Sequence, residues 1–234
     1  SEKIAYGMGD VACNVVYALT SGLIVYFYTN VIGVSAGVVG TILLVSRVFD
    51  GVSDLLIAQL MDKINSRHGK ARAWILWMAA PYAVSATALF AVPSHAGKMV
   101  QAIYIFVTYN FCTTVCYTAI NLPYGSLSAM MTRVSSERDM LSVVRMGLSP
   151  LGKIIAVTFT TPLVKLFGND QAAWVKTMAV WAVLALILLL ICFINCKETV
   201  VIAGQEKAEK VPIKKGLKLL VTNQYFWAVL LLWM

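Results

Sequence analysis

The sequence predicts an all-α membrane protein that crosses the bilayer several times, and three observations lead to this fold class. Hydrophobic residues make up 59% of the 234 residues and charged residues only 13%, too little charge for the surface of a soluble domain. The apolar residues occur in blocks long enough to cross about 30 Å of hydrocarbon. These blocks lack the roughly ten-residue alternating pattern of membrane β-strands, so helices are expected.

Six apolar blocks are expected to span the membrane, at residues 5–30, 36–61, 73–93, 99–131, 140–166 and 173–196. Basic connections at 62–72, 133–139 and 197–222 alternate with nearly neutral ones at 30–35, 93–98 and 167–170. By the positive-inside rule, this alternation predicts a multi-pass protein of the cell (plasma) membrane with a cytoplasmic N-terminus. The loops also account for the net charge of +8, so nucleic acid is not an expected partner. The first block is too long for a cleavable signal.

The chain is expected to divide into three parts. Residues 1–196 form a six-helix transmembrane bundle, and the polar residues 197–222, interrupted by Gly204, Pro212 and Gly216, form a cytoplasmic linker. Residues 223–234 begin a seventh span, and both chain ends look cut. This layout predicts a twelve-helix transporter whose partners are the lipid bilayer and a missing C-terminal half.

The second span carries the strongest cluster of intramembrane charges: Arg47, Asp50 and Asp54. Helical geometry places all three within an arc of about 60°. Two carboxylates one turn apart repel in a low dielectric unless a cation lies between them, one is protonated, or Arg47 neutralises part of the charge. The cluster therefore predicts a site that exchanges Na⁺ or H⁺. The alternative is a static buried salt-bridge network.

Polar residues in two other spans are candidates for contacts with an ion or a substrate. Asp10 and Asn14 lie one turn apart in the first span. The fourth span carries a polar stripe of Asn110, Thr114, Thr118 and Asn121. Such oxygen-rich side chains suit Na⁺ and the hydroxyls of a polyol, whereas hydrogen bonds between helices are the alternative. Pro123 releases a backbone carbonyl and bends the helix, which favours a functional role for Asn121.

The fifth span contains Arg145 and Lys153. Arg145 either contacts substrate or extends its charge to the cytoplasmic interface. Cysteines at helical spacing, Cys112 with Cys116 and Cys192 with Cys196, have no histidine or carboxylate nearby in sequence, so they are expected to be small buried residues. No paired nucleophile and base or metal triad is evident, so neither an enzyme nor a cofactor is expected.

Several segments resemble one known family in the same order along the chain: GDVACN, RVFDGVSD, DKINSRHGKARAW, INLPYGSL and SSERDMLSVVR. They are similar to the glycoside–pentoside–hexuronide:cation symporters, the melibiose-permease group of the major facilitator superfamily. The resemblance runs from about Ile4 to the end of the chain. It implies that the six helices are the N-terminal bundle of a major-facilitator fold, with alternating access to a central sugar site coupled to Na⁺, H⁺ or Li⁺.

The resemblance assigns roles by position. Asp50 and Asp54 match the family's cation-binding carboxylates, Ser53 and Thr118 its neutral oxygen ligands, and Arg47 the neighbouring arginine. It places Asn14 and Asn121 at sugar-contacting positions and Arg145 near a family arginine. With Asp10 of the first span, these residues are the substrate-binding candidates.

Three departures from the melibiose permease bear on the substrate. That permease has aspartates at Asn14 and Asn121 and a tryptophan at Gly125, which argues against melibiose itself. The loss of two negative charges leans toward a neutral glycoside or pentoside over a hexuronide.

The loop after the second span resembles the superfamily's cytoplasmic gating loop, with Asp62, Arg67, Lys70 and Arg72 as its charge network. Such charges pair with helix ends in one conformation and separate in the other. The alternative is a purely topological role. Leu55 replaces the proline that follows the second carboxylate in the family, so a helix kink is not expected there.

Together these features predict the N-terminal half of a symporter that couples Na⁺ or H⁺ to a sugar or glycoside. Transport of a lysolipid or another amphiphile is one alternative, for which Gly125 leaves room. A non-transporting fragment is the other.

Overall fold

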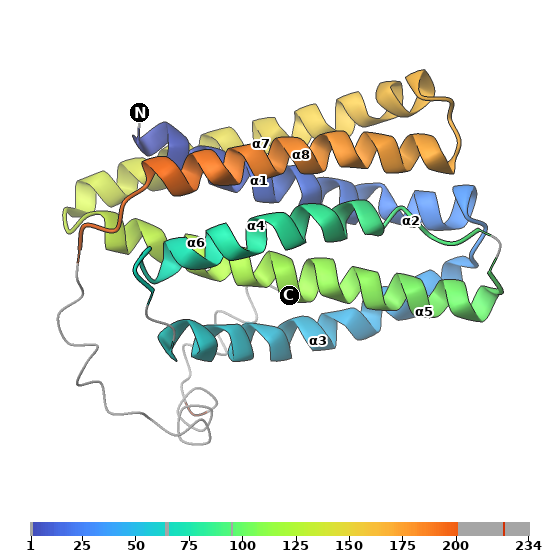
Figure 1. Ribbon diagram of the computed structural model, residues 1–234, viewed down its shortest axis with the longest axis horizontal. Helices are drawn as coiled ribbons and strands as arrows, with labels where there is room; N and C mark the ends of the chain where they lie inside the picture. Colours follow the sequence, from blue (N-terminus) through green and yellow to red (C-terminus); the bar gives the residue numbers. More distant parts are fainter. Residues whose placement is uncertain (1, 64–65, 95, 201–221, 223–234) are drawn as a thin grey trace. The chain divides into compact units, whose positions relative to one another are not determined.

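The computed structural model describes residues 2–63, 66–94, 96–200 and 222, without the side chains of residues 62 and 63. Within these ranges the chain is helical and contains no strand (Figure 1). Along the chain the helices are α1 (Glu2–Gly22), α2 (Ile24–Tyr26), η1 (Phe27–Val31), α3 (Ala36–Lys63), α4 (Ala71–Ala88), α5 (Lys98–Tyr109), η2 (Asn110–Tyr117), α6 (Thr118–Met131), α7 (Ser135–Leu166) and α8 (Gln171–Asn195). η1 and η2 are π-helical. The expected all-α fold is confirmed.

The predicted spans correspond to these helices, with shifts at some boundaries and a difference in shape in the first span. The first predicted span, residues 5–30, is not straight: α1 and the following α2–η1 segment meet at a bend of 42°. The bend follows the pair Ser21–Gly22, and the short α2 segment separates it from the π-helical turn η1. Glycine–serine pairs and π-helical turns are common causes of helix kinks.

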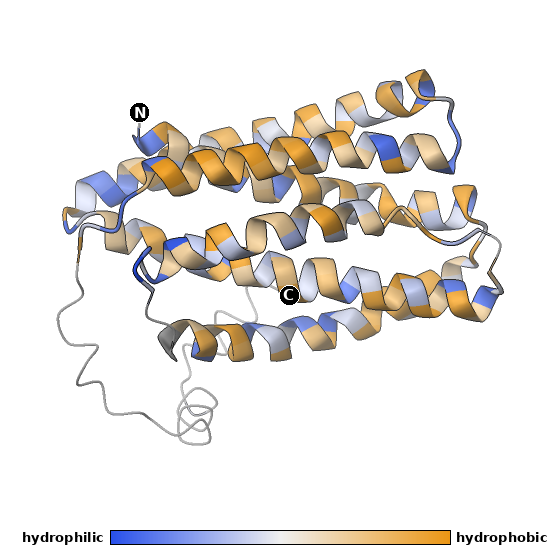
Figure 2. Cartoon of the chain, viewed as in Figure 1, coloured by the Kyte–Doolittle hydropathy of each residue, from blue (hydrophilic) through white to orange (hydrophobic). Residues whose placement is uncertain are grey.

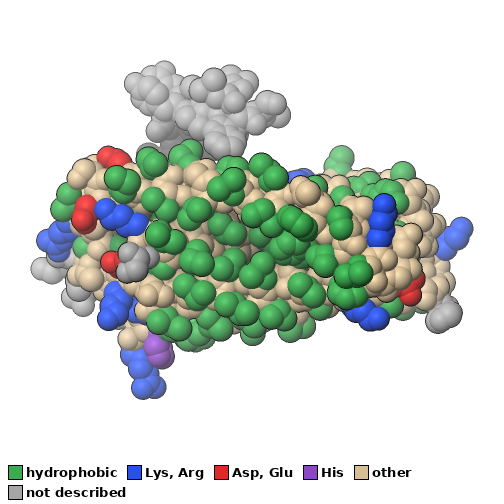
Figure 3. Space-filling view, turned by 90° about the horizontal axis from the view of Figure 1, so that it is seen from above, with side chains coloured by type: hydrophobic (Ala, Val, Ile, Leu, Met, Phe, Trp, Pro, Cys, Tyr) green, Lys and Arg blue, Asp and Glu red, His purple; other side chains and the backbone are tan. Residues whose placement is uncertain are grey.

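Three helical segments of the described residues are long and apolar enough to cross a bilayer, or four if the bent first segment is included. Within the described ranges, this holds for residues 98–131, for α7 and for α8, and for the bent first segment if it counts as one span. α4 has only 18 residues, and α3 carries Arg47, Asp50 and Asp54. In Figure 2 apolar residues dominate the middle of the helices, and in Figure 3 charged side chains gather toward the two ends. The protein is therefore a multi-pass membrane protein.

The bundle is built around α1. This helix packs against α7 and α8, α4 packs against α8 and α6, and α3 lies against η2, α6 and α5. α1, α4 and α7 begin at the same end of the bundle at which α3, α6 and α8 finish, which we call the Glu2 end (left in Figure 1). The predicted linker at 197–222 and the seventh helix at 223–234 lie outside the described residues, except for 197–200 and Thr222.

Gly9 permits a close approach between helices in the core. A β-carbon at Gly9 would lie 2.7 Å from Tyr124 Cε2 and 2.8 Å from Cys192 Sγ. Gly9→Ala is therefore expected to lower the free energy of unfolding by about 1–3 kcal/mol, as overpacking does in other cores. Thermal unfolding in detergent measures this effect. Gly37→Ala is the matched control, because nothing lies within 4 Å of its β-carbon. Equal melting temperatures for the two variants would contradict close packing at Gly9.

Candidate functional site

Asp50 is the centre of a polar cluster between α3 and η2. Thr114 Oγ1 donates a hydrogen bond of 2.5 Å to Asp50 Oδ1, and Arg47 Nη1 lies 3.6 Å from Asp50 Oδ2. Ser53 Oγ donates a bond of 2.6 Å to the Thr114 carbonyl oxygen. Both Asp50 oxygens are thus engaged, while the side chain keeps 29% of its exposure.

The π-helical stretch η2 positions the partner of Asp50. One turn before Thr114, Asn110 Nδ2 donates to Ser46 Oγ at 2.9 Å, so two successive turns of η2 are bonded to α3. The Thr114 hydroxyl also lies 3.3 Å from Asn110 Oδ1. Isolated π-helical turns in α-helices occur frequently at functional sites. Two residues of the predicted polar stripe, Asn110 and Thr114, therefore make hydrogen bonds between helices. These bonds hold the Asp50 carboxylate.

Asp54 lies one turn from Asp50 on α3, toward the Glu2 end, and its side chain is exposed. In the part of the chain that the structure describes, its carboxylate has no hydrogen bond or ion pair. Thr118 is buried at the start of α6, one turn beyond Thr114. A static salt-bridge network would pair both carboxylates, whereas here Arg47 contacts Asp50 alone.

A second polar cluster joins α1 to α7. Asp10 is 8% exposed, and its Oδ1 lies 4.0 Å from Arg145 Nε. The Arg145 guanidinium also lies 6.0 Å from the centre of the Tyr124 ring. Asn14 donates through Nδ2 to the Asp10 carbonyl oxygen at 2.9 Å, within α1. Arg145 is thus held by groups of the bundle rather than directed only toward the membrane surface.

The Tyr124 ring that faces Arg145 is itself fixed by Tyr6. The two rings stack with their centres 4.6 Å apart, and each hydroxyl donates to the other residue's carbonyl oxygen, at 3.4 Å and 2.5 Å. Asn121 lies on α6 within one turn of Tyr124 and is half-buried. Gly125 follows on the same helix and is exposed, and a β-carbon added there would have nothing within 4 Å.

The predicted gating loop is bonded to the segment that follows α8. The backbone N–H groups of Lys70, Ala71 and Arg72 donate to the Glu198 carboxylate at 2.8, 2.9 and 2.8 Å. A carboxylate at a helix N-terminus satisfies otherwise unbonded N–H groups and interacts favourably with the helix dipole. Arg72 donates through Nε and Nη2 to the Phe193 carbonyl oxygen near the end of α8.

Residues 198–200 also bond to the end of α6. The Thr199 and Val200 N–H groups donate to the Met130 carbonyl oxygen at 3.0 and 2.9 Å, and Thr199 Oγ1 donates to that of Met131 at 2.6 Å. We call residues 198–200 the clasp, because they join the start of α4 to the end of α6 beside the end of α8. Of the other predicted loop charges, Arg67 is exposed, and the Asp62 side chain lies outside the described residues.

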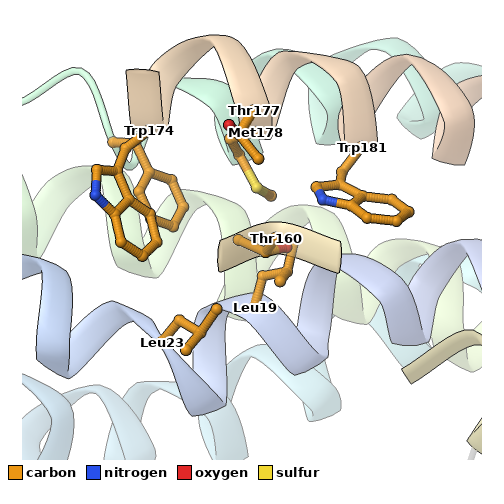
Figure 4. A pocket seen from close by; sticks show the side chains of 8 residues that line it. Leu19, Leu23, Thr160, Trp174, Thr177, Met178 and Trp181 are labelled. Atoms are coloured by element: carbon orange, nitrogen blue, oxygen red, sulfur yellow. The ribbon is translucent and has the colours of Figure 1, made fainter. Parts of the chain in front are cut away.

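A small cavity in the described bundle lies away from these clusters. It is lined by Leu19 and Leu23 of α1, Thr160 of α7 and Trp181 of α8, among others (Figure 4). It has room for about one water molecule. A sugar does not fit there.

Comparison with known proteins shows the family. The family model described as MFS/sugar transport protein matches residues 5–234. The chain belongs to this family of sugar transporters. It is 37% identical, over 98% of its length, to the "Putative glycoside/cation symporter YagG" of Escherichia coli (strain K12), and covers 49% of that protein.

Two further relatives of this chain carry names that specify a sugar. It is 34% identical over 99% of its length to the "Isoprimeverose transporter" of Lactiplantibacillus pentosus, and covers 48% of it. It is 31% identical over 85% of its length to the "Glucuronide carrier protein homolog" of Escherichia coli (strain K12), and covers 44% of it. The chain therefore spans about half the length of these relatives. The predicted family is confirmed.

Sequence patterns alone miss several contacts of this bundle. Thr118 is the predicted neutral ligand, whereas the hydroxyl that contacts Asp50 belongs to Thr114. The only available signal is the polar stripe, in which both threonines occur. The sequence gives no signal that Glu198 binds the start of α4, because Glu198 lies in a polar segment 126 residues beyond its partner Arg72.

Proposed function

We propose that this chain forms the N-terminal half of a cation-coupled sugar symporter that works by alternating access. The observation that carries the proposal is the asymmetry of the two carboxylates near the middle of α3. Asp50 is bonded to Thr114 and Arg47, whereas Asp54, one turn away, is without a partner among the described residues. Such a pair has a place for one positive charge, and intramembrane carboxylates commonly mark ion pathways.

In this mechanism a Na⁺ ion or a proton binds between Asp50 and Asp54, and oxygen atoms of Ser53 and Thr118 complete the site for Na⁺. Binding cancels part of the repulsion between the carboxylates and orders the contact between α3 and η2. Polar groups of α1, α6 and α7 then engage the sugar hydroxyls: Asp10, Asn14, Asn121 and Arg145. Occupancy by both ligands lowers the cost of moving this bundle relative to a second, C-terminal bundle.

The clasp and the gating loop are proposed to face the cytoplasm, in agreement with the basic character of the loops. Arg72 bonds to a helix end, as expected for a charge of a gating loop in one of its two conformations. Residues 197–222 would then connect the two bundles on the cytoplasmic side, and residues 223–234 would begin the second.

The test is uptake of labelled glycosides, pentosides and hexuronides into vesicles that contain the full-length protein, with Na⁺ and H⁺ gradients imposed separately. We expect one sugar class to accumulate under one of the two gradients. Absence of uptake under both gradients would contradict the proposal.

A lysolipid or another amphiphile is the second candidate substrate, and the open space at Gly125 favours it. A labelled amphiphile that binds the full-length protein, and that unlabelled lysolipid displaces but no sugar does, would support this function. A Gly125→Trp variant would discriminate further, because a large ring at this position would block an acyl chain while providing a surface on which a sugar stacks.

A further inference from the structure

The small cavity of Figure 4 lies in the half of the bundle away from the Glu2 end. Thr160 of α7 and both Thr177 and Trp181 of α8 are among the residues that line it. Thr160 lies about 9 Å along α7 from the last residue of the helix, Leu166, and Trp181 about 15 Å along α8 from its first. These depths place the cavity inside a hydrocarbon core about 30 Å thick, where lipid offers no hydrogen-bond partner.

The indole N–H of Trp181 is a buried donor that points into this cavity. Trp181 is 6% exposed, and its Nε1 atom has no hydrogen-bond partner among the residues that the structure describes. Figure 4 shows the nitrogen on the edge of the ring that is turned toward the other lining residues. A buried N–H without an acceptor is costly in an apolar environment, and most such groups in native proteins are bonded. Trp181 Nε1 therefore needs an acceptor from within the cavity.

The two threonine hydroxyls beside the cavity offer acceptors but no free hydrogen. Thr160 Oγ1 donates to the Ala156 carbonyl oxygen at 2.6 Å, and Thr177 Oγ1 donates to that of Ala173 at 2.8 Å. A hydroxyl has one hydrogen and two lone pairs, so each oxygen still accepts a bond. Neither oxygen is within hydrogen-bond distance of Trp181 Nε1, so no direct bond satisfies the indole. A gap of this kind between polar groups is one that a bridging molecule fills.

These groups define the chemistry of the occupant. It must accept one hydrogen bond from the indole, donate two to the hydroxyl oxygens, and be no larger than about one water molecule. Na⁺ does not match, because the indole N–H directs a partial positive charge at it. An ammonium ion has no lone pair for the indole. An apolar occupant would leave all three groups unbonded, whereas a water molecule satisfies each of them.

We propose that this cavity is a site for one ordered water molecule, which accepts from Trp181 Nε1 and donates to Thr160 Oγ1 and Thr177 Oγ1. Three hydrogen bonds are typical of a buried water. The water joins α7 to α8, because the first span contributes only Leu19 and Leu23 to the lining. The inference concerns the packing of this bundle and does not rest on the proposed symport.

The direct test is a structure of the full-length protein at a resolution that shows ordered water. We expect a single density peak about 2.7–3.2 Å from Trp181 Nε1, Thr160 Oγ1 and Thr177 Oγ1. Thr160→Val keeps the shape of the side chain and removes one acceptor. This variant should lose the peak and lower the melting temperature in detergent by about 2 °C or more.

Thr87→Val is the matched control for stability. Thr87 Oγ1 makes the same bond to the carbonyl oxygen four residues earlier, Ala83, but Thr87 does not line the cavity. It should therefore lower the melting temperature less than Thr160→Val does. An equal fall in both variants would overturn the bridging role of the water. A wild-type cavity without density, or with the elongated density of an acyl chain, would overturn the site itself.

A second measurement follows the indole N–H groups in solution. Transfer of magnetisation from water to the ¹⁵N-labelled indoles of the full-length protein should reach Trp181, whose signal is identified by its absence in Trp181→Phe. Trp74, identified in the same way, is the control. Its Nε1 is also buried without a partner among the described residues, but it packs against Ile57 and Ala119 in an apolar cluster. Absence of transfer to Trp181, or equal transfer to both indoles, would contradict the proposal.

Discussion

Asp50→Asn is expected to abolish cation-driven sugar accumulation by the full-length protein, with a loss of at least about 100-fold in uptake. Asparagine keeps an oxygen that accepts the bond from Thr114 Oγ1, so the contact between α3 and η2 is preserved. The substitution removes the negative charge that attracts the cation, and it leaves Arg47 without its contact. Uptake of labelled sugar into vesicles under an imposed gradient measures the effect.

Asp139→Asn is the control for this variant, since Asp139 is an exposed carboxylate in the first turns of α7. It should accumulate sugar as the wild type does. If the Asp50 variant still concentrates sugar against a gradient, the α3 carboxylates are not the coupling site.

Glu198→Gln should destabilise the bundle by about 2–3 kcal/mol and slow transport, because three backbone N–H groups at the start of α4 donate to the Glu198 carboxylate. Glutamine has one acceptor oxygen and no charge, so it leaves some of these groups unbonded and loses the interaction with the helix dipole. Thermal unfolding in detergent gives the stability, and initial uptake rates give the effect on transport.

Glu137→Gln is the matched control. Glu137 also lies in the first turn of a helix, but it is exposed and accepts a side-chain bond from Thr132. Its melting temperature should stay close to that of the wild type. An unchanged melting temperature in Glu198→Gln would mean that the clasp does not stabilise the start of α4.

Hydropathy is sufficient to predict the helices of this bundle, but not their local irregularities. The last predicted span, residues 173–196, lies close to α8 at Gln171–Asn195, because the helix is apolar along its whole length. α7 begins earlier than predicted, at Ser135, since its first turns are charged and lie outside the apolar block. The break after Gly22 is not evident from hydropathy because apolar residues continue through it.

The cation-site candidates show why contacts are harder to predict than helices. An apolar stripe does not reveal the π-helical turn at Asn110–Tyr117, and each additional residue in a turn rotates the following side chains by about 100°. Whether Thr114 or Thr118 faces Asp50 depends on that rotation. The contact of Lys153 with Tyr17 likewise depends on how α7 packs against α1, about which the sequence of either helix alone contains no information.

The most direct test of coupling is the affinity of the full-length protein for its sugar with and without the cation, measured by calorimetry. If the cation binds at Asp50 and Asp54 and orders the sugar site, Na⁺ or a lower pH should raise sugar affinity about 5- to 150-fold. The same change should be absent in Asp54→Asn, because the cation site is then lost. A sugar affinity independent of both Na⁺ and pH in the wild type would contradict coupling through these two carboxylates.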